Sequence, residues 1–183
     1  RLGPELGALA EAAKLDVVER CRLILNELTR ATGETTDLAA YRGGAMVFLD
    51  QVPGLHRLRT VSSVGDVFPL TNTANGRACL ALMPPEEARS AIEAELARTG
   101  KDIDVDGLLT QLGRIRADGL AYDTDEHSVG ISAIGFAFED MSGQKYAISV
   151  PVPSSRYVQS QAMVETALRH AKTQVADALN LPQ

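Results

Sequence analysis

Apolar residues recur every three or four positions over the first thirty residues, and this is the period of an amphipathic helix. Pro4 suits the first turn of such a helix, and Gly33 suits the position just past its end. We therefore predict one helix over residues 4–32, long enough to serve partly as a connector. Its predicted apolar face comprises Ala10, Ala13, Val17, Cys21, Ile24, Leu28 and Ala31.

After Gly33 the pattern changes to the alternation that is typical of strands. Residues 35–41 and 46–52 are two predicted strands around the turn signal RGGA. Residues 57–61 also alternate and are predicted to form a third strand, whereas residues 64–70 are predicted to be loop. Three consecutive strands with short connections favour antiparallel pairing.

The rest of the chain predicts three helices, three strands and a final helix. Asn72 or Thr73 can cap the first of these helices, and Asp104 or Asp106 can cap the third. The predicted helices cover residues 74–82, 84–100, about 106–119 and 157–179, and the predicted strands cover residues 121–125, 131–139 and 145–150. Because strands and helices do not alternate, a parallel sheet is disfavoured. We expect an α+β domain with one six-stranded antiparallel sheet and helices on its faces.

Charge and composition exclude some classes of function for this chain. The net charge of −6 argues against nucleic acid binding by this chain, since phosphates require a positive surface. No apolar run approaches the roughly 20 residues of a membrane span, and no signal peptide is visible. The isolated cysteines Cys21 and Cys79 are predicted to be buried free thiols, which favours a reducing cytoplasm.

An acidic cluster directly precedes an uncharged run in the second half of the chain. It contains Asp123, Asp125, Glu126 and His127. In a regular strand Asp123, Asp125 and His127 would share one face, and Glu126 would lie on the other. Two carboxylates and an imidazole are able to hold a divalent metal, so a metal-dependent enzyme is one hypothesis. The alternative is that Asp123 faces a ligand, Asp125 and Glu126 are solvated or paired, and His127 supports the turn into Gly130.

A second candidate site is the start of the helix over residues 74–82. The free amide groups of Ala74, Asn75 and Gly76 would point at whatever lies in front of that helix. Helix N-termini favour anions such as carboxylates, although an ordinary capped helix has the same sequence pattern.

Three segments, in order, resemble the effector-binding domain of IclR-type bacterial transcription regulators. They are ATGETTDLAAYRGGAMVFLDQV at residues 31–52, VGDVFPLTNTANGRACLALMPPEE at residues 64–87, and LGRIRADGLAYDTDEHSVGISAIGFAFEDMSGQKYAISVPVPSSR at residues 112–156. Arg77 stands where the family usually has Lys. The resemblance implies a GAF-like domain with a curved sheet and a ligand pocket on one side, and it implies no cofactor and no catalysis.

The resemblance also implies a domain organisation. Residues 1–32 would be a connector helix and residues 33–183 the effector-binding domain. A winged helix-turn-helix that binds DNA would precede them, outside this chain, and the full regulator would be a homo-oligomer, a dimer or a tetramer. No membrane partner is expected.

The implied effector is a small organic acid. Its carboxylate would face the amides of Ala74, Asn75 and Gly76, with Asp123 and Ser149 orienting other polar groups. By position in the family, further pocket residues are Phe68, Ile131 and Ala133. The remaining hypotheses are the metal-dependent enzyme and an interaction module without a ligand.

Overall fold

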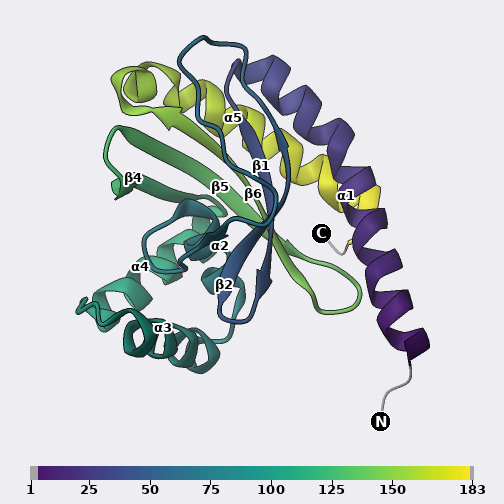
Figure 1. Cartoon of the computed structure of the whole chain (residues 1–183). Coiled ribbons are helices and arrows are strands. Elements are labelled where there is room, and N and C mark those ends of the chain that lie inside the picture. The colour runs from purple at the N-terminus through teal and green to yellow at the C-terminus, as the bar shows by residue number, and fades with distance from the viewer. Residues whose placement is uncertain (1–3, 182–183) are drawn as a thin grey trace.

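The computed structural model describes residues 4–181, with side chains from residue 16 onward. The described residues form one sheet with helices on both faces (Figure 1). The helices are α1 (Pro4–Thr32), α2 (Ala74–Leu82), α3 (Pro85–Thr99), α4 (Val105–Asp118) and α5 (Ser154–Leu179). The strands are β1 (Thr36–Arg42), β2 (Ala45–Val52), β3 (Val67–Phe68), β4 (Ala121–Ser128), β5 (Ile131–Glu139) and β6 (Lys145–Pro153).

The sheet has the strand order β3-β2-β1-β6-β5-β4, and each neighbouring pair is antiparallel. The predicted α+β class and curved six-stranded antiparallel sheet are confirmed. The two sets of three strands meet at β1 and β6, where Asp37 lies opposite Ser149. Ser149 in turn lies opposite Gly135 on β5. This row of residues crosses the middle of the sheet and runs under the site described below.

Two layers of helices explain why the central strands are apolar on both faces. Helices α1 and α5 pack together on one face, while α2 and α4 cover the other (Figure 1). Along β6, Tyr146, Ile148 and Val150 belong to the α1–α5 core, and Ala147 belongs to the α2–α4 core. Burial on both faces therefore replaces the alternation that a half-exposed strand would show.

Helix α1 has the predicted bounds, and most of its predicted apolar face is buried. The buried positions are Val17, Cys21, Ile24 and Leu28. Ala31 is exposed at the helix end, and Ala10 and Ala13 lie outside the described side chains. Cys21 and Cys79 are both free and buried, as predicted, and burial raises the pKa of each thiol to about 12.

The predicted strand over residues 57–61 is wrong. Those residues belong to a loop, residues 53–66, and β3 follows it at Val67–Phe68, inside the segment predicted to be loop. The free edge of β2 pairs with β3 through Met46 and Phe68, and the ring of Phe68 stacks on Phe48 at 4.5 Å between centroids. Residues 57–61 do not form a strand because β3 pairs with the edge of β2 that such a strand would need.

Strand β6 is longer than predicted, despite two prolines. It pairs with β1 only up to Ser149, so the β1-facing edge is free beyond that residue. Pro151 and Pro153 lie in this stretch and stay paired with β5 on the other edge. Proline is tolerated at a free strand edge because its missing N–H leaves no ladder bond unmade. Helix α5 then begins at once, at Ser154.

Among residues 4–181, none of the helices combines the length and the apolar character that a membrane span requires.

Candidate functional site

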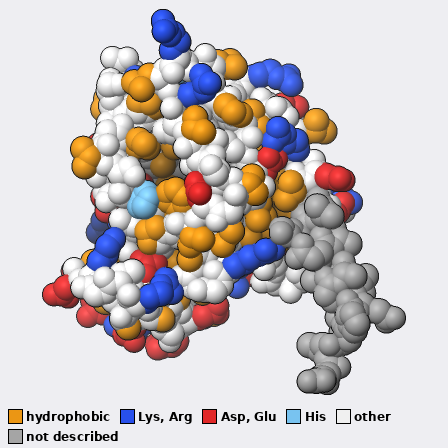
Figure 2. Space-filling view, in the orientation of Figure 1, with side chains coloured by type: hydrophobic (Ala, Val, Ile, Leu, Met, Phe, Trp, Pro, Cys, Tyr) orange, Lys and Arg blue, Asp and Glu red, His pale blue; other side chains and the backbone are white. Residues whose placement is uncertain are grey.

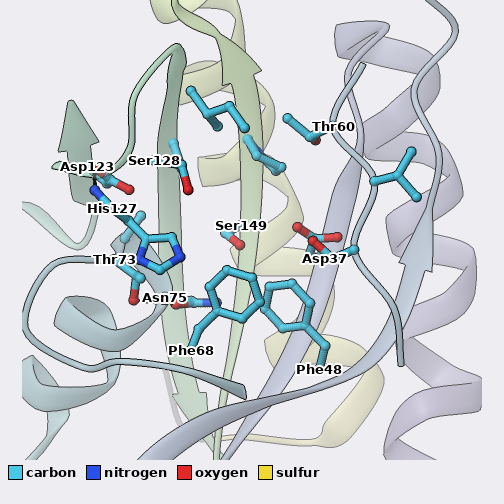
Figure 3. Close-up of a pocket in the computed structure, with 16 residues that line it drawn as sticks. Asp37, Phe48, Thr60, Phe68, Thr73, Asn75, Asp123, His127, Ser128 and Ser149 are labelled. Carbon is cyan, nitrogen blue, oxygen red and sulfur yellow. Dashed lines mark hydrogen bonds between the residues drawn. The ribbon is translucent and has the colours of Figure 1, made fainter. Parts of the chain in front are cut away.

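A cavity of about 200 Å³ lies over the sheet, between the loop of residues 53–66 and the N-terminus of α2 (Figure 3). Its lining comes from every strand of the sheet, from this loop and from α2. The face in Figure 2 has hydrophobic side chains across its middle, and charged side chains lie around them, along the upper edge and at the lower edge over α3 and α4. No Lys or Arg is among the described residues that line the cavity.

Most of the predicted contact residues line this cavity. Phe68, Ala74, Asn75 and Asp123 do so from β3, α2 and β4. Ile131, Ala133 and Ser149 do so from β5 and β6.

Gly76 is the exception among the predicted residues, because it does not line the cavity. Its amide donates to the hydroxyl of Thr73 at 3.1 Å, and so it is used in capping α2. A Cβ at residue 76 would lie 2.5 Å from the backbone of Leu70. Gly76 therefore permits close packing of the helix, and the amides that remain for a ligand are those of Ala74 and Asn75.

The start of α2 also presents a side-chain donor. Oδ1 of Asn75 lies 2.7 Å from the Thr73 hydroxyl. Figure 3 shows the Asn75 nitrogen on the opposite side, toward the cavity. Nδ2 has no hydrogen-bond partner among the described side chains. The helix dipole and this amide together make this end of the cavity favourable to a negatively polarised group.

Asp123 lies at the same end of the cavity. Its Oδ1 accepts hydrogen bonds from the amides of Glu126 at 2.9 Å and His127 at 3.3 Å. Burial raises the pKa of Asp123 above its ordinary value, against the opposing effect of these two bonds. Oδ1 of Asp123 therefore stabilises the backbone at the end of β4. The other oxygen, Oδ2, is available to a ligand in the cavity.

The structure divides the acidic cluster, and the predicted common face of Asp123, Asp125 and His127 is wrong. Asp125 has a positive φ of 58°, which breaks the alternation of β4. Its carboxylate accepts from the amide of Gly130 at 2.6 Å and from the hydroxyl of Ser154 at 2.8 Å. These bonds lower the pKa of Asp125 and use its carboxylate at the turn between β4 and β5.

Asp125, and not His127 as predicted, therefore supports the turn into Gly130. The ring of His127 instead lines the cavity, tilted against Phe68 with 4.8 Å between ring centroids. Burial lowers the pKa of His127, which favours its neutral form. Within the described residues no group of three or more His, Cys, Asp or Glu side chains is placed to hold a metal.

Glu126 was predicted to be solvated or paired, and it forms a bidentate ion pair with Arg77. Arg77 is buried on α2 and also donates to the carbonyl oxygens of Thr71 at 2.8 Å and Tyr122 at 3.0 Å. This arginine thus ties α2 to β4 and fixes the two sides of the cavity end. Its planar donor fork makes several such bonds at once, which a lysine ammonium would not do as rigidly.

The sequence interpretation missed Asp37, whose side chain lines the opposite end of the cavity from Asp123 (Figure 3). Only 2% of Asp37 is exposed, and Nε2 of Gln51 donates to its Oδ1 at 2.6 Å. Burial raises the pKa of Asp37 to about 7. The one signal in the sequence was an acid in the strand TTDLAAY, where an apolar residue would be expected.

Two hydroxyl groups along the cavity lack hydrogen-bond partners among the described side chains. Oγ1 of Thr60 is buried and unpartnered. Ser149, opposite Asp37 in the sheet, also makes no side-chain hydrogen bond within the described residues, and Figure 3 shows it at the centre of the cavity floor. A cavity with an apolar wall and a few unpaired polar groups is typical of a small-molecule site.

Comparisons with known proteins agree with this geometry. The family model described as "Bacterial transcriptional regulator IclR C-terminal" matches residues 9–177. The HTH-type transcriptional regulator Rv1719 of Mycobacterium tuberculosis is 41% identical over 170 residues, covering 92% of this chain and 66% of that protein. The regulator TtgV of Pseudomonas putida is 29% identical over 180 residues, covering 98% of this chain and 69% of that protein. Both are named as regulators and not as enzymes.

Solved structures show the same fold. The transcriptional regulator YaiJ superposes with a TM-score of 0.80 at 24% identity, covering 90% of this chain and 96% of that chain. The IclR protein of Thermotoga maritima also has a TM-score of 0.80, at 23% identity, covering 89% of this chain and 68% of that chain. The chain spans about two thirds of the length of its curated relatives. It belongs to the family of C-terminal domains of IclR-type bacterial transcriptional regulators.

Proposed function

We propose that this chain is the effector-sensing domain of a DNA-binding regulator, and that its effector is a small organic acid. The observation that carries the proposal is the position of the cavity at the N-terminus of α2, where Ala74 and Asn75 line it. A carboxylate there would be stabilised by their N–H groups and by the helix dipole. Gly76, whose amide caps the helix, is left out of this contact.

The rest of the cavity supports a short carbon skeleton with further polar groups. Phe68 and Ile131 would enclose the skeleton, and Ala133 leaves room beside them. Asp123 and Ser149 would orient a hydroxyl or keto group. A volume of about 200 Å³ is below the range of roughly 300–1,000 Å³ that is usual for drug-sized ligands, which favours a small metabolite.

The proposal also includes the coupling of effector binding to DNA binding. Residues 1–32, which contain helix α1, would connect residues 33–183 to an N-terminal winged helix-turn-helix that binds the operator, in the cytoplasm. The full regulator would assemble as a dimer or a tetramer. Effector binding changes DNA affinity only if the ligand prefers one arrangement of these parts, so the coupling equals that difference in affinity.

Thermal unfolding with pyruvate, hexanoate and benzoate tests the proposal. A ligand that binds the native state at 100 times its Kd adds about 2.7 kcal/mol, which for a chain of this size raises Tm by about 5–10 °C. Asn75→Asp should abolish the response, because a negative charge near the helix N-terminus repels the carboxylate without weakening the helix.

Asn26→Asp on α1 is the matched control, since it adds the same charge outside the cavity. The proposal fails if none of the three acids raises Tm, or if Asn75→Asp responds like the wild type.

A further inference from the structure

The cavity has two polar ends, which lie over β1 and β4 with two strands between them. Asp37 on β1 lies beside Ser149 on β6, while Asp123 on β4 is paired with Ala133 on β5. Strands β1 and β4 are three positions apart in the sheet, which corresponds to about 14 Å at the usual spacing of neighbouring strands. Figure 3 shows Asp37 on one side and Asp123 with Asn75 on the other.

The Asp37 end is built from buried groups, and its hydrogen-bonding capacity is not used up. An ionised carboxylate offers about four acceptor positions, yet Gln51 is the only donor to Asp37 among the described side chains. With Asp37 only 2% exposed, bulk water does not satisfy the rest. A buried polar group without partners costs free energy, so a partner supplied from the cavity would be stabilising.

Neighbouring groups hold this end in place. Oε1 of Gln51 accepts from the amide of Ser62 at 3.3 Å, which orients the side chain that reaches Asp37. The carbonyl of Thr60 accepts from the Thr35 hydroxyl at 2.8 Å, and this bond brings the loop close to β1. The buried, unpartnered hydroxyl of Thr60 is drawn on the same side of the cavity as Asp37 in Figure 3.

The charges exclude some occupants of this end. No Lys or Arg lines the cavity among the described residues, and the helix N-terminus that faces the Asp123 end has no counterpart at the Asp37 end. Above pH 7, where Asp37 is ionised, a second carboxylate at this end would therefore meet a like charge with nothing to offset it. A hydroxyl or an ammonium group would instead donate to the free lone pairs of Asp37. Donation to a charged acceptor is worth more than an ordinary hydrogen bond.

We infer that Asp37 and Thr60 form a second polar subsite, which binds a hydrogen-bond-donating group of the effector at the end opposite its carboxylate. This inference rests on the proposed function. It narrows the effector class to short hydroxy or amino acids in which the two groups are separated by an apolar middle. Simple monocarboxylates fill only the α2 end, and dicarboxylates are disfavoured.

Isothermal titration calorimetry at pH 8, where Asp37 is ionised, tests the inference with two matched series of probes. The aromatic series is benzoate, 4-hydroxybenzoate and terephthalate, and the aliphatic series is pentanoate, 5-aminopentanoate and glutarate. In at least one series we expect the donor-bearing compound to bind at least tenfold more tightly than the simple acid, and the dicarboxylate to bind more weakly than it.

Asp37→Asn separates the subsite from the rest of the cavity. Its Oδ1 still accepts from Gln51, while the remaining acceptor is replaced by an amide donor. We expect the preference for the donor-bearing compound to fall to less than threefold, with binding of the simple acid retained. Asp118→Asn, at a half-exposed acid outside the cavity, should leave the preference unchanged.

The outcomes distinguish the inference from the function on which it rests. Equal binding within both series, or a preference that survives Asp37→Asn, overturns the second subsite and leaves the sensing of acids at α2 intact. Absence of binding by all six probes, with the protein folded by circular dichroism, overturns both.

Discussion

Two buried carboxylic acids in this chain differ in what surrounds them. Glu95 on α3 is 1% exposed and accepts three hydrogen bonds, from the amides of Leu70 and Thr71 and from the Thr71 hydroxyl. Asp37 on β1 is 2% exposed and accepts one, from Gln51. Glu95 lies away from the cavity, whereas Asp37 lines it.

Burial alone therefore does not identify a functional acid in this fold. Glu95 satisfies the backbone of the turn that leads into α2, and this turn places Ala74 and Asn75 at the cavity. Asp37 has acceptor capacity that only the cavity can fill. The first arrangement stabilises the protein and the second costs stability, which is the expected sign for a group kept for binding.

The largest expected effect is at Glu95. Glu95→Ala leaves two buried amides and a buried hydroxyl without an acceptor, so we expect a loss of about 4 kcal/mol in the free energy of unfolding. Urea unfolding measures it. Glu93→Gln, at an exposed position of the same helix, is the control and should change stability by less than about 0.5 kcal/mol. A loss below about 1 kcal/mol for Glu95→Ala would contradict the view that Glu95 stabilises the fold whereas Asp37 costs stability.

The next effect is a gain of stability. The pKa of Asp37 is raised from 3.8 to about 7 in the folded state, so between these values the folded protein holds a proton that the unfolded chain releases. Wild-type stability attributable to this group is therefore present below about pH 4 and is lost as the pH rises toward 7. Asp37→Asn has no such loss.

We expect Asp37→Asn to be more stable than the wild type by about 2 kcal/mol at pH 8, and less stable than it by about 2 kcal/mol near pH 4. The shift alone converts to roughly 4 kcal/mol, but the asparagine amide also lacks partners. Urea unfolding of both proteins at pH 4.5, 6 and 8 gives the difference in their free energies of unfolding. The pKa shifts of all other groups are common to both proteins and cancel in this difference. A difference that does not grow with pH contradicts the explanation.

The smallest effects come from a matched pair of hydroxyl groups. The Thr71 hydroxyl donates to Glu95 at 2.6 Å, and so Thr71→Val should cost about 1.5 kcal/mol. The Thr60 hydroxyl is buried and unpartnered, and so Thr60→Val should be neutral or stabilise by up to about 1 kcal/mol. Thermal and urea unfolding of the two variants compares them directly. Equal losses would show that Thr60 has a partner in solution and would weaken its assignment to the subsite.

Local signals in the sequence were sufficient to predict most of the helices. Proline at residue 4 and the repeat of apolar positions predicted α1, and a cap at Asn72 or Thr73 together with Pro84 beyond the end predicted α2 at about residues 74–82. Such signals act within a few residues, since a cap satisfies the amides of the helix it precedes. The strand predicted at residues 57–61 failed because a strand also requires a neighbouring edge, and Phe68 fills that edge by stacking on Phe48.

The candidate site also has one part that local sequence signals predicted and one part that depends on distant contacts. The sequence by itself determined the order of elements, the family and the α2 end of the cavity, because these depend on periodicity, caps and ordered motifs. The sequence left both a shared face and a separate Asp123 open, and only the tertiary structure decided for separation, through a positive φ at Asp125 that is held by Gly130 and the distant Ser154. The tertiary structure alone placed Asp37 opposite Ser149 and under the loop of residues 53–66. Whether a polar group is buried, and whether it finds a partner, depends on segments far away in the chain.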